Sequence, residues 1–235
     1  MSGRLYLVPT LLAPSAPEDV LPARTIAIAR GLVHYIVENA KPARGFLRAL
    51  GPAVPIRNIV IEEIGDTPTP ARCAALLAPA RDGHDLGLLS DAGCPGIADP
   101  GALVVAAAHR EGIAVVPLVG PSSLVLALMA SGMNGQRFTF HGYLPVKPDA
   151  RAEAIRRLEA DSQASGGAQL FIETPYRNAA LLSALVATLK PATRLAVAAD
   201  LTSASETIES RPAGEWRGRD PARYDKRPAL FILQA

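Results

Sequence analysis

One stretch of the chain, residues 86–132, decides the fold: LGLLSDAGCPGIADPGALVVAAAHREGIAVVPLVGPSSLVLALMASG. Leu86–Leu89 is a short apolar run, which predicts a strand buried on both faces of a sheet. A helix-like segment follows and ends at Gly112, and Ile113–Leu118 is the next apolar run. This order of strand, turn, helix and strand predicts a parallel α/β sheet.

The turn after the first of these strands is built from small residues. Ser90–Ala98 contains Gly93 and Gly96, so its backbone amides can approach a bound ligand closely. Asp99 and Pro100 are typical of a helix start, with Asp99 as the N-cap and Pro100 as the first helical residue. By itself such a turn is more often structural than functional.

A second small-residue turn, Gly120–Ser123, follows the next strand and opens another helix. Open α/β sheets bind ligands in a crevice at the carboxyl ends of their strands. Two such turns at neighbouring strand ends therefore favour a binding site over a purely structural connection.

The rest of the first half continues the alternation of strands and helices. A Pro-rich loop runs through Pro17 after the first strand. The predicted strands are Arg4–Val8, Val33–Val37 and Asn58–Ile64, and the predicted helices are Pro22–Arg30, Pro42–Leu50 and Pro70–Ala80.

The pattern changes after Gly132. Helices are expected at about Asp149–Ser165 and at Arg177–Leu189. The expected strands are Arg137–Gly142, Ala168–Glu173, Arg194–Ala199, Thr207–Arg211 and Ala229–Gln234. The last two have hairpin-like spacing, which predicts a mixed sheet with antiparallel pairing. We expect two α/β domains, residues 1–119 and 120–235.

Composition excludes several classes of protein. The chain has 235 residues, 49% hydrophobic and 20% charged, as in a packed globular protein, and its net charge of +2 gives no overall basic footprint. Cys73 and Cys94 lack metal-ligand spacing, so we expect no metal site and a reducing, cytoplasmic compartment. No apolar run has the roughly 18–20 residues that span a bilayer, so we expect no membrane association.

Other strand ends also carry polar residues. Glu38 follows one predicted strand, Glu173–Arg177 another, and Asp200–Thr202 a third. Each could be a simple strand or helix cap, but several such motifs together favour a site. The chain lacks a Walker sequence, a G-x-G-x-x-G turn after its first strand and a G-x-S-x-G elbow, which disfavours Rossmann dinucleotide binding and serine hydrolysis.

At these motifs the chain resembles a known family. SDAGCPGIADPG, VVPLVGPSS, FHGYLPVK followed by Arg151, FIETPYR and DLTSASE occur in the order of the tetrapyrrole methylase superfamily, the class III S-adenosylmethionine-dependent methyltransferases. They are most similar to the branch that methylates a cytidine ribose 2′-hydroxyl in 16S ribosomal RNA. The resemblance covers most of the chain and implies a methyltransferase that acts on RNA or a similar acceptor.

The resemblance also implies a fold and a cofactor site. It implies two α/β domains of five strands each, a parallel N-terminal sheet and a mixed C-terminal sheet, with S-adenosylmethionine bent in a cleft between them. Members are typically homodimers, so we expect a homodimer, with RNA or a ribosomal subunit as substrate. The implied cofactor contacts are Leu12, Gly93, Cys94, Ile97, Ser123, Leu124, Ile172, Leu201 and Ala229.

The chain departs from that branch at three places. PTLLAPSAPED replaces its usual TPIGNL-type loop, and the segment aligned with AAEDTR keeps Glu38 but has Asn39 and Lys41. Lysine lacks the two-pronged guanidinium geometry for phosphate. The chain stops at the final strand, which predicts a short form without the branch's C-terminal extension.

Two other functions stay open. A tetrapyrrole C-methyltransferase, of the uroporphyrinogen or precorrin type, would normally carry a glycine-rich turn after the first strand, which Pro9–Leu12 lacks. A catalytically silent protein that binds S-adenosylmethionine is the other. For a hydroxyl acceptor, a nearby carboxylate would assist proton removal, and the candidate catalytic residues are Glu38, Glu173 and Asp200.

Overall fold

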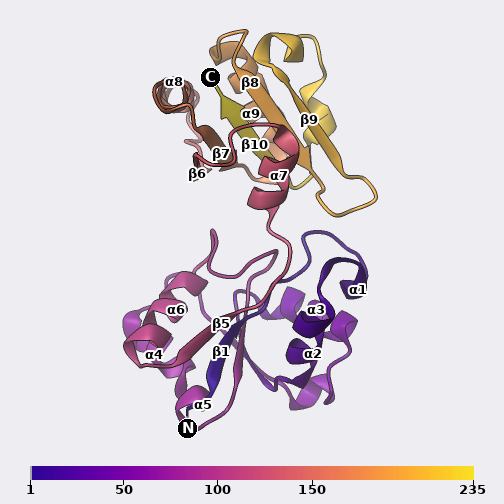
Figure 1. The fold of residues 1–235 in the computed structure, drawn as a ribbon, viewed down its shortest axis with the longest axis vertical. Coiled ribbons are helices and arrows are strands. Elements are labelled where there is room, and N and C mark those ends of the chain that lie inside the picture. The colour runs from indigo at the N-terminus through magenta and orange to yellow at the C-terminus, as the bar shows by residue number, and fades with distance from the viewer. Residues whose placement is uncertain (1) are drawn as a thin grey trace. The chain divides into compact units, whose positions relative to one another are not determined.

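The computed structural model describes residues 2–235 (Figure 1). The chain divides into two compact units, of which the first ends at Ser122 and the second spans Ser123–Ala235. Each unit is built on its own five-stranded sheet, as the two-domain α/β prediction requires.

The first unit contains a fully parallel sheet in the order β3-β2-β4-β1-β5. All four residues of β4 are buried, which confirms a central strand covered on both faces. The strands are β1 Arg4–Leu7, β2 His34–Val37, β3 Val60–Glu63, β4 Leu86–Leu89 and β5 Ala114–Pro117.

Helices cover both faces of this sheet (Figure 1). α2 and α3 pack with Tyr35 and Val37 on one face, whereas α4, α5 and α6 pack with Ile36 and Leu88 on the other. The helices of the unit are α1 Pro17–Val20, α2 Ala23–Gly31, α3 Ala40–Leu50, α4 Pro70–Leu76, α5 Ala78–Arg81 and α6 Gly101–Arg110, with a 3₁₀ turn, η1, at Ile56–Asn58.

The second unit contains a mixed sheet in the order β6-β7-β10-β8-β9. β6 and β7 are parallel, and β10 is antiparallel to both β7 and β8. β9 returns antiparallel to β8. The strands are β6 Phe138–Tyr143, β7 Ala168–Ile172, β8 Arg194–Ala199, β9 Thr207–Pro212 and β10 Ala229–Gln234.

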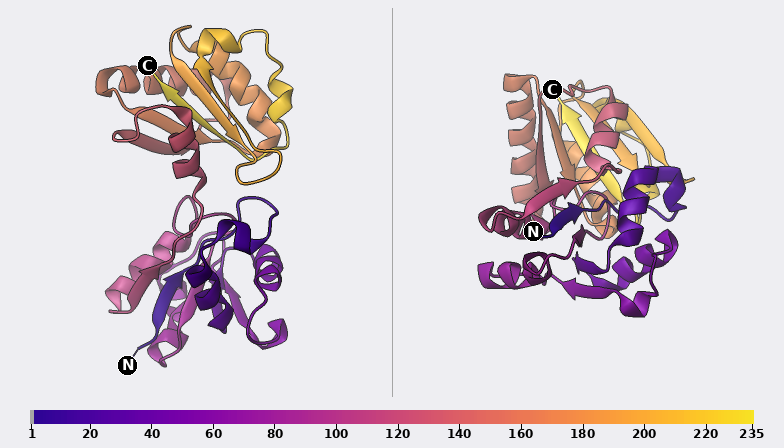
Figure 2. Two further views of the ribbon diagram at one scale, coloured as in Figure 1. Left: turned by 45° about the vertical axis from the view of Figure 1, so that its right-hand side comes forward. Right: turned by 60° about the horizontal axis from the view of Figure 1, so that its bottom comes forward.

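The core of the second unit lies between this sheet and the pair α8 and α9 (Figure 2). Phe171, Phe231 and Leu185 are fully buried there, while α7 packs against β8, β9 and β10. The helices are α7 Ser123–Ser131, α8 Pro148–Ser165 and α9 Asn178–Thr188, with 3₁₀ turns η2 Pro175–Arg177, η3 Ala213–Trp216 and η4 Pro221–Tyr224.

Several element predictions are wrong in detail. The single helix expected at residues 70–80 is two helices, because the Pro79 ring has no amide hydrogen and clashes with the preceding turn. The Pro-rich loop gives way to α1 at Pro17, where proline suits the first helical turn. α6 begins at Gly101, one residue later than expected, and Arg177 lies in η2 rather than in α9.

Candidate active site

Four loops of the first unit converge at the carboxyl edge of its sheet. Because all its strands are parallel, the segments after β1, β2, β4 and β5 leave the same edge. The chain after β1 leads to a helix on one face, and the chain after the adjacent β4 leads to α6 on the other face. Such a reversal between neighbouring strands opens the crevice in which α/β sheets bind ligands.

Hydrogen bonds tie the loop after β1 to the turn after β4. The Thr10 amide donates to the Gly93 carbonyl at 2.9 Å, and the Thr10 hydroxyl donates to the Ser90 carbonyl at 3.3 Å. The Ser90 hydroxyl lies 3.2 Å from the same Gly93 carbonyl. The turn is thus fixed to its neighbour before any ligand binds.

Gly93 has a conformation that other residues rarely adopt. Its φ is +73°, and an added Cβ would lie 3.0 Å from Leu12 Cδ2 and 3.4 Å from the Pro121 carbonyl oxygen. The neighbouring Cys94 thiol donates to that same carbonyl at 3.3 Å, and burial raises the pKa of this thiol. The structure therefore brings the predicted residues Leu12, Gly93 and Cys94 together.

Asp99 closes the far end of the same turn. Its carboxylate accepts the Gly96 amide at 2.9 Å and the Gly101 amide at 2.7 Å, which ties the turn to the first residue of α6. The N-cap itself is Pro100, so the prediction of Asp99 as the N-cap is wrong by one residue. Burial raises the pKa of Asp99, and the two amide hydrogen bonds oppose that rise. Ile97 lies between these anchor points and exposes 52% of its surface, so its side chain is available to a ligand.

Glu38 forms hydrogen bonds with the beginning of the turn after β4. Its amide donates to the Leu89 carbonyl at 3.2 Å, and its carboxylate oxygen Oε2 accepts the Asp91 amide at 3.0 Å. Burial raises the pKa of the Asp91 carboxyl, and the negative charge of Glu38 raises it further. Two carboxylates thus lie beside one another at the strand ends.

A cavity of about 490 Å³ opens beside these carboxylates. Its walls are the loop after β1, the outer side of α3 and the turn after β4. Leu11, Leu12 and Phe46 supply an apolar lining, while Thr10 and Asp91 supply polar groups. An apolar hollow with a few polar groups is typical of a small-molecule site.

The predicted residues of the second unit also share one edge. β7 and β8 both run antiparallel to β10, so their carboxyl ends lie beside the start of β10. Leu230 pairs with Ile172, and Ala229 pairs with Ala199, the residue before Asp200. Ile172, Glu173, Asp200, Leu201 and Ala229 therefore gather at this edge.

The Glu173 carboxylate binds neighbouring groups at this edge of the sheet. Its side chain is fully buried, and its Oε1 accepts the Thr174 amide at 2.7 Å and two guanidinium nitrogens of Arg177 at 2.6 and 3.0 Å. Its other oxygen, Oε2, is buried without a hydrogen-bond partner among the described residues. The arrangement is that of a structural ion pair with one unused acceptor.

Asp200 lies in a strained loop. Its φ is +52° and that of Thr202 is +70°, and for a β-branched residue this left-handed region is a genuine outlier. The Asp200 carboxylate accepts Arg227 Nε at 2.6 Å and the Ser205 hydroxyl at 3.1 Å. Strain of this kind is concentrated at functional sites.

The start of α7 points toward the same edge. At the other end of α7, Arg194 donates to the Ser131 and Gly132 carbonyls at 3.2 and 2.8 Å. Arg194 is the first residue of β8, and α7 packs along that strand. Ser123 and Leu124, at the amino end of α7, therefore lie toward the end of β8 that bears Asp200.

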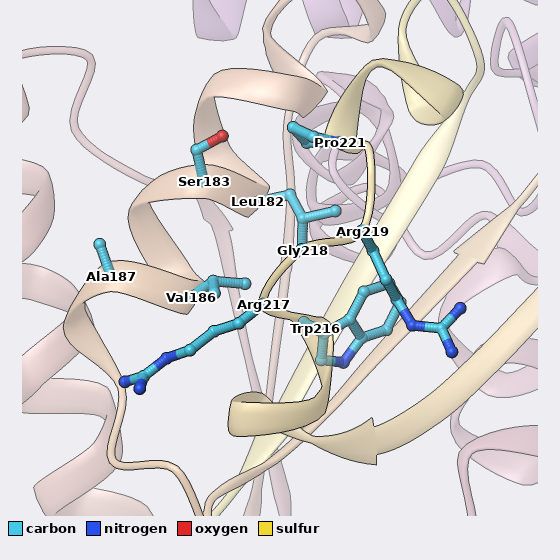
Figure 3. Close-up of a pocket in the computed structure, with 9 residues that line it drawn as sticks. All are labelled: Leu182, Ser183, Val186, Ala187, Trp216, Arg217, Gly218, Arg219 and Pro221. Carbon is cyan, nitrogen blue, oxygen red and sulfur yellow. The ribbon is translucent and has the colours of Figure 1, made fainter.

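A second hollow, of about 470 Å³, lies between α9 and the connection from η3 to η4 (Figure 3). Trp216, one of its lining residues, donates to the Leu195 carbonyl near the start of β8, at the edge opposite Asp200. Figure 3 shows Arg217 and Arg219 pointing away from each other, so their charges do not converge. None of the predicted site residues lines this hollow.

Residues 2–235 contain neither a metal-binding cluster nor a membrane-spanning helix. No group of three or more His, Cys, Asp or Glu side chains is arranged to hold a metal ion in that range. Likewise, no helix there combines the length and apolar character needed to cross a membrane.

The sequence interpretation missed two charged residues. Asp91 directly follows the strand-end Ser90, a position that could have been singled out, but its proximity to Glu38 depends on the strand order. Arg227 pairs with Asp200, 27 residues away in the sequence, and no local pattern predicts such a contact.

Known proteins match this chain along most of its length. The family model described as Tetrapyrrole (Corrin/Porphyrin) Methylases matches residues 21–216. A protein named ribosomal RNA small subunit methyltransferase I from Escherichia coli O157:H7 is 31% identical over 233 residues, which are 98% of this chain and 77% of that protein. Its namesake from Mycobacterium tuberculosis (strain ATCC 25618 / H37Rv) is 33% identical over 207 residues, 88% of this chain and 69% of that protein.

Solved structures share the fold. The methyltransferase CobJ superposes with a TM-score of 0.65 at 18% identity, covering 100% of this chain and 95% of CobJ. A uroporphyrin-III-C-methyltransferase from Thermus thermophilus gives a TM-score of 0.59 at 21% identity, with coverage of 100% and 93%. Because the family model matches residues 21–216 and the E. coli relative is 31% identical over 98% of the chain, the chain belongs to the tetrapyrrole methylase family and is a methyltransferase.

Proposed function

We propose that this enzyme transfers a methyl group from S-adenosylmethionine to a ribose 2′-hydroxyl of ribosomal RNA. The observation that carries the proposal is the 31% identity to an enzyme named for small-subunit ribosomal RNA, which extends over 98% of this chain. The match to the E. coli relative is nearly end to end, so it spans the strand-end loops as well as the core.

The cofactor site we propose consists of residues from both units. In the first unit it uses Leu12, Gly93, Cys94 and Ile97, which the fixed turn after β4 brings together. Gly93 has no Cβ, which lets Leu12 and the Pro121 carbonyl approach its backbone closely and holds the turn in its left-handed conformation. In the second unit the proposed contacts are Ser123, Leu124, Ile172, Leu201 and Ala229.

S-adenosylmethionine supplies an electrophilic methyl group bound to a sulfonium. The enzyme's part is to hold the acceptor oxygen in line with that group, since positioning alone can provide a large share of the rate. The apolar cavity beside Leu12 and Phe46 has the size to receive a nucleoside, and we place the acceptor there.

Of the three candidate carboxylates, Glu38 is the one best placed to take the acceptor proton. It lies beside Asp91, which lines the proposed acceptor cavity, and among residues 2–235 its carboxylate accepts one hydrogen bond, from the Asp91 amide to Oε2. Glu173 is tied to Arg177 and Asp200 to Arg227, so both are better suited to holding their loops. Asp91 is a second acceptor for the same proton.

We also propose that the enzyme acts as a homodimer in the cytoplasm, where ribosomal subunits are found. α7 supports the dimer, because Val125 and Met129 lie one turn apart and expose 51% and 73% of their surface. Adjacent exposed apolar side chains on a helix favour a contact with another protein surface.

A transfer assay tests the proposal. The purified chain is incubated with methyl-tritiated S-adenosylmethionine and, separately, with small ribosomal subunits, free 16S ribosomal RNA and uroporphyrinogen. We expect tritium in the RNA, released by nuclease digestion as a 2′-O-methyl nucleoside. Label in uroporphyrinogen instead would identify a tetrapyrrole C-methyltransferase, and cofactor binding without transfer to any pool would identify a silent binding protein.

A further inference from the structure

The Arg151 side chain is largely buried and forms no hydrogen bond or ion pair within residues 2–235. It lies in the first turn of α8 and exposes only 9% of its surface. Its Nε is buried and makes no hydrogen bond, and Arg151 takes part in none of the ion pairs formed within residues 2–235. It follows the motif FHGYLPVK, which the proposed cofactor contacts leave unused.

A buried guanidinium nitrogen such as Arg151 Nε is unfavourable unless a ligand supplies an acceptor. Arginine is rarely buried without a partner, because an unpaired charge loses its hydration without compensation. Glu173, which directly follows β7, also has a buried oxygen, Oε2, without a hydrogen-bond partner among the described residues. Glu173 already forms an ion pair with Arg177, however, so a contact with Arg151 would make two arginines share one carboxylate.

The fold places Arg151 at the same edge as the candidate site. Tyr143, at the end of β6, pairs with Ile172, the residue before Glu173. The short connection from Tyr143 to Pro148 then starts α8, which packs against β7, β10 and α9. The beginning of α8 therefore lies near the strand ends that carry Ile172 and Glu173.

The amino end of α8 adds further donors for an anion. Side chains of a helix lean toward its amino end, so Arg151 leans toward the first turn. No side chain caps this helix. Pro148 has no amide hydrogen and the Arg151 amide donates to the Lys147 carbonyl, so the first-turn amides without a partner in the helix are those of Asp149 and Ala150. The positive end of the helix dipole favours an anion there. The acidic Asp149 is two positions from Arg151 and thus faces another side of the helix.

We propose that Arg151 and the amino end of α8 bind a phosphodiester group of the RNA acceptor. This inference rests on the proposed function, because RNA is the polyanion that the enzyme would have to hold. A guanidinium group matches two phosphate oxygens with parallel hydrogen bonds, a geometry that lysine cannot provide. The buried aliphatic part of the Arg151 side chain fixes the position of the guanidinium group before RNA binds.

The test compares Arg151→Gln with Arg156→Gln. Arg156 lies on the same helix, is exposed, and forms none of the ion pairs of the described chain, so both variants remove one charge from α8. Binding to fluorescently labelled 16S ribosomal RNA is measured by anisotropy at several salt concentrations, and S-adenosylmethionine binding by calorimetry. We expect Arg151→Gln to weaken RNA binding about tenfold and to reduce the salt slope by about one unit. The RNA affinity of Arg156→Gln should stay within about twofold of that of the wild type, because a single exposed charge contributes little to binding.

Arg151→Lys provides a second variant in case the glutamine protein does not fold. It keeps the charge and loses the fork, so we expect weaker RNA binding with an unchanged salt slope and unchanged cofactor binding. Wild-type RNA affinity in a folded Arg151 variant would overturn the inference and leave the proposed function intact. If the wild type and Arg156→Gln also failed to bind or methylate RNA, the proposed function itself would fall, and this inference with it.

Discussion

At the scale of single residues, Gly93 gives the sharpest prediction. Its φ of +73° and the 3.0 Å approach to Leu12 leave no room for a branched side chain. We expect Gly93→Val to displace the turn and to weaken S-adenosylmethionine binding at least about tenfold, since strain of about 1–2 kcal/mol would add to the clash. Calorimetry with purified protein measures the affinity.

Gly112→Val is the matched control for that substitution. Gly112 also has a positive φ, +67°, but an added Cβ there meets no atom within 4 Å. The control should lose a similar amount of stability and keep its cofactor affinity. Equal affinities of Gly93→Val and the wild type would refute the position of the cofactor in this turn.

Glu38 gives a prediction about the chemical step. Glu38→Gln keeps an oxygen that can accept the Asp91 amide but can no longer take a proton. We expect kcat for methyl transfer to fall by roughly 10²–10⁴-fold with little change in cofactor affinity, as for loss of a general base. Single-turnover transfer of tritium to RNA measures it.

Glu173→Gln separates a catalytic role from a structural one. The Glu173 carboxylate pairs with Arg177 and is fully buried, so its replacement should lower the melting temperature more than it lowers the transfer rate of the folded protein. Full activity of Glu38→Gln together with an inactive but stable Glu173→Gln would assign the base to the second unit instead.

At the scale of elements, a cluster on β9 links strand and 3₁₀ turn. Glu209 accepts the Tyr224 hydroxyl at 2.8 Å and pairs with Arg211, Arg223 and Arg219 at 2.6, 2.7 and 3.5 Å. Burial opposes its ionisation, but the Tyr224 hydrogen bond and the charges of Arg223 and Arg211 together outweigh burial and lower the pKa of Glu209.

This cluster predicts a pH dependence of stability. Because folding lowers the pKa of Glu209 from its ordinary value of 4.5, the stabilisation is complete above that value and is lost as the pH falls through the folded pKa. At pH 7 we expect Glu209→Gln to reduce the free energy of unfolding by about 2 kcal/mol, as for a hydrogen bond to a charged group. Urea unfolding at pH 7 and pH 4 should show the difference between variant and wild type shrinking at the lower pH. A constant difference would contradict the role of the charge.

The order of strands and helices could be predicted from local patterns. Leu86–Leu89 was predicted with its observed bounds, because an apolar run between turn residues is a local signal. The break at Pro79 was missed, although proline marks it, since alanine and leucine on either side favour a helix. The position of β10 between β7 and β8 depends on long-range pairing, which spacing along the chain does not contain.

For the candidate site, as for the fold, local patterns predicted the loops but not the long-range contacts between them. Small residues after β4 and polar residues after other strands marked the loops, because strand ends are where α/β sheets bind ligands. The pairing of Glu38 with the Asp91 amide, and of Asp200 with Arg227, depends on which strands are neighbours. The burial of Arg151 likewise depends on how α8 packs on its sheet, so no local pattern indicated it.

At the scale of the whole molecule, the homodimer is open to a direct test. Met129 and Val125 on α7 are the exposed apolar residues that support it. Sedimentation velocity of the wild type should give a dimer of the 24.6 kDa chain, and Met129→Lys should shift it toward the monomer, because a charge in a buried contact is unfavourable. Val60→Lys, a change at an exposed residue of β3 in the other unit, is the control and should remain dimeric. A wild type that sediments only as a monomer would contradict the expectation.

The central claim is that main-chain groups of the strand-end turns hold the methyl donor. The most direct measurement is a crystal structure of the enzyme with S-adenosylhomocysteine, the product left after methyl transfer. We predict that its nucleoside contacts the turn that contains Gly93, Cys94 and Ile97, with further contacts from Ser123 and Ala229. A nucleoside bound elsewhere, such as in the hollow beside Trp216 and Arg217, would contradict this account.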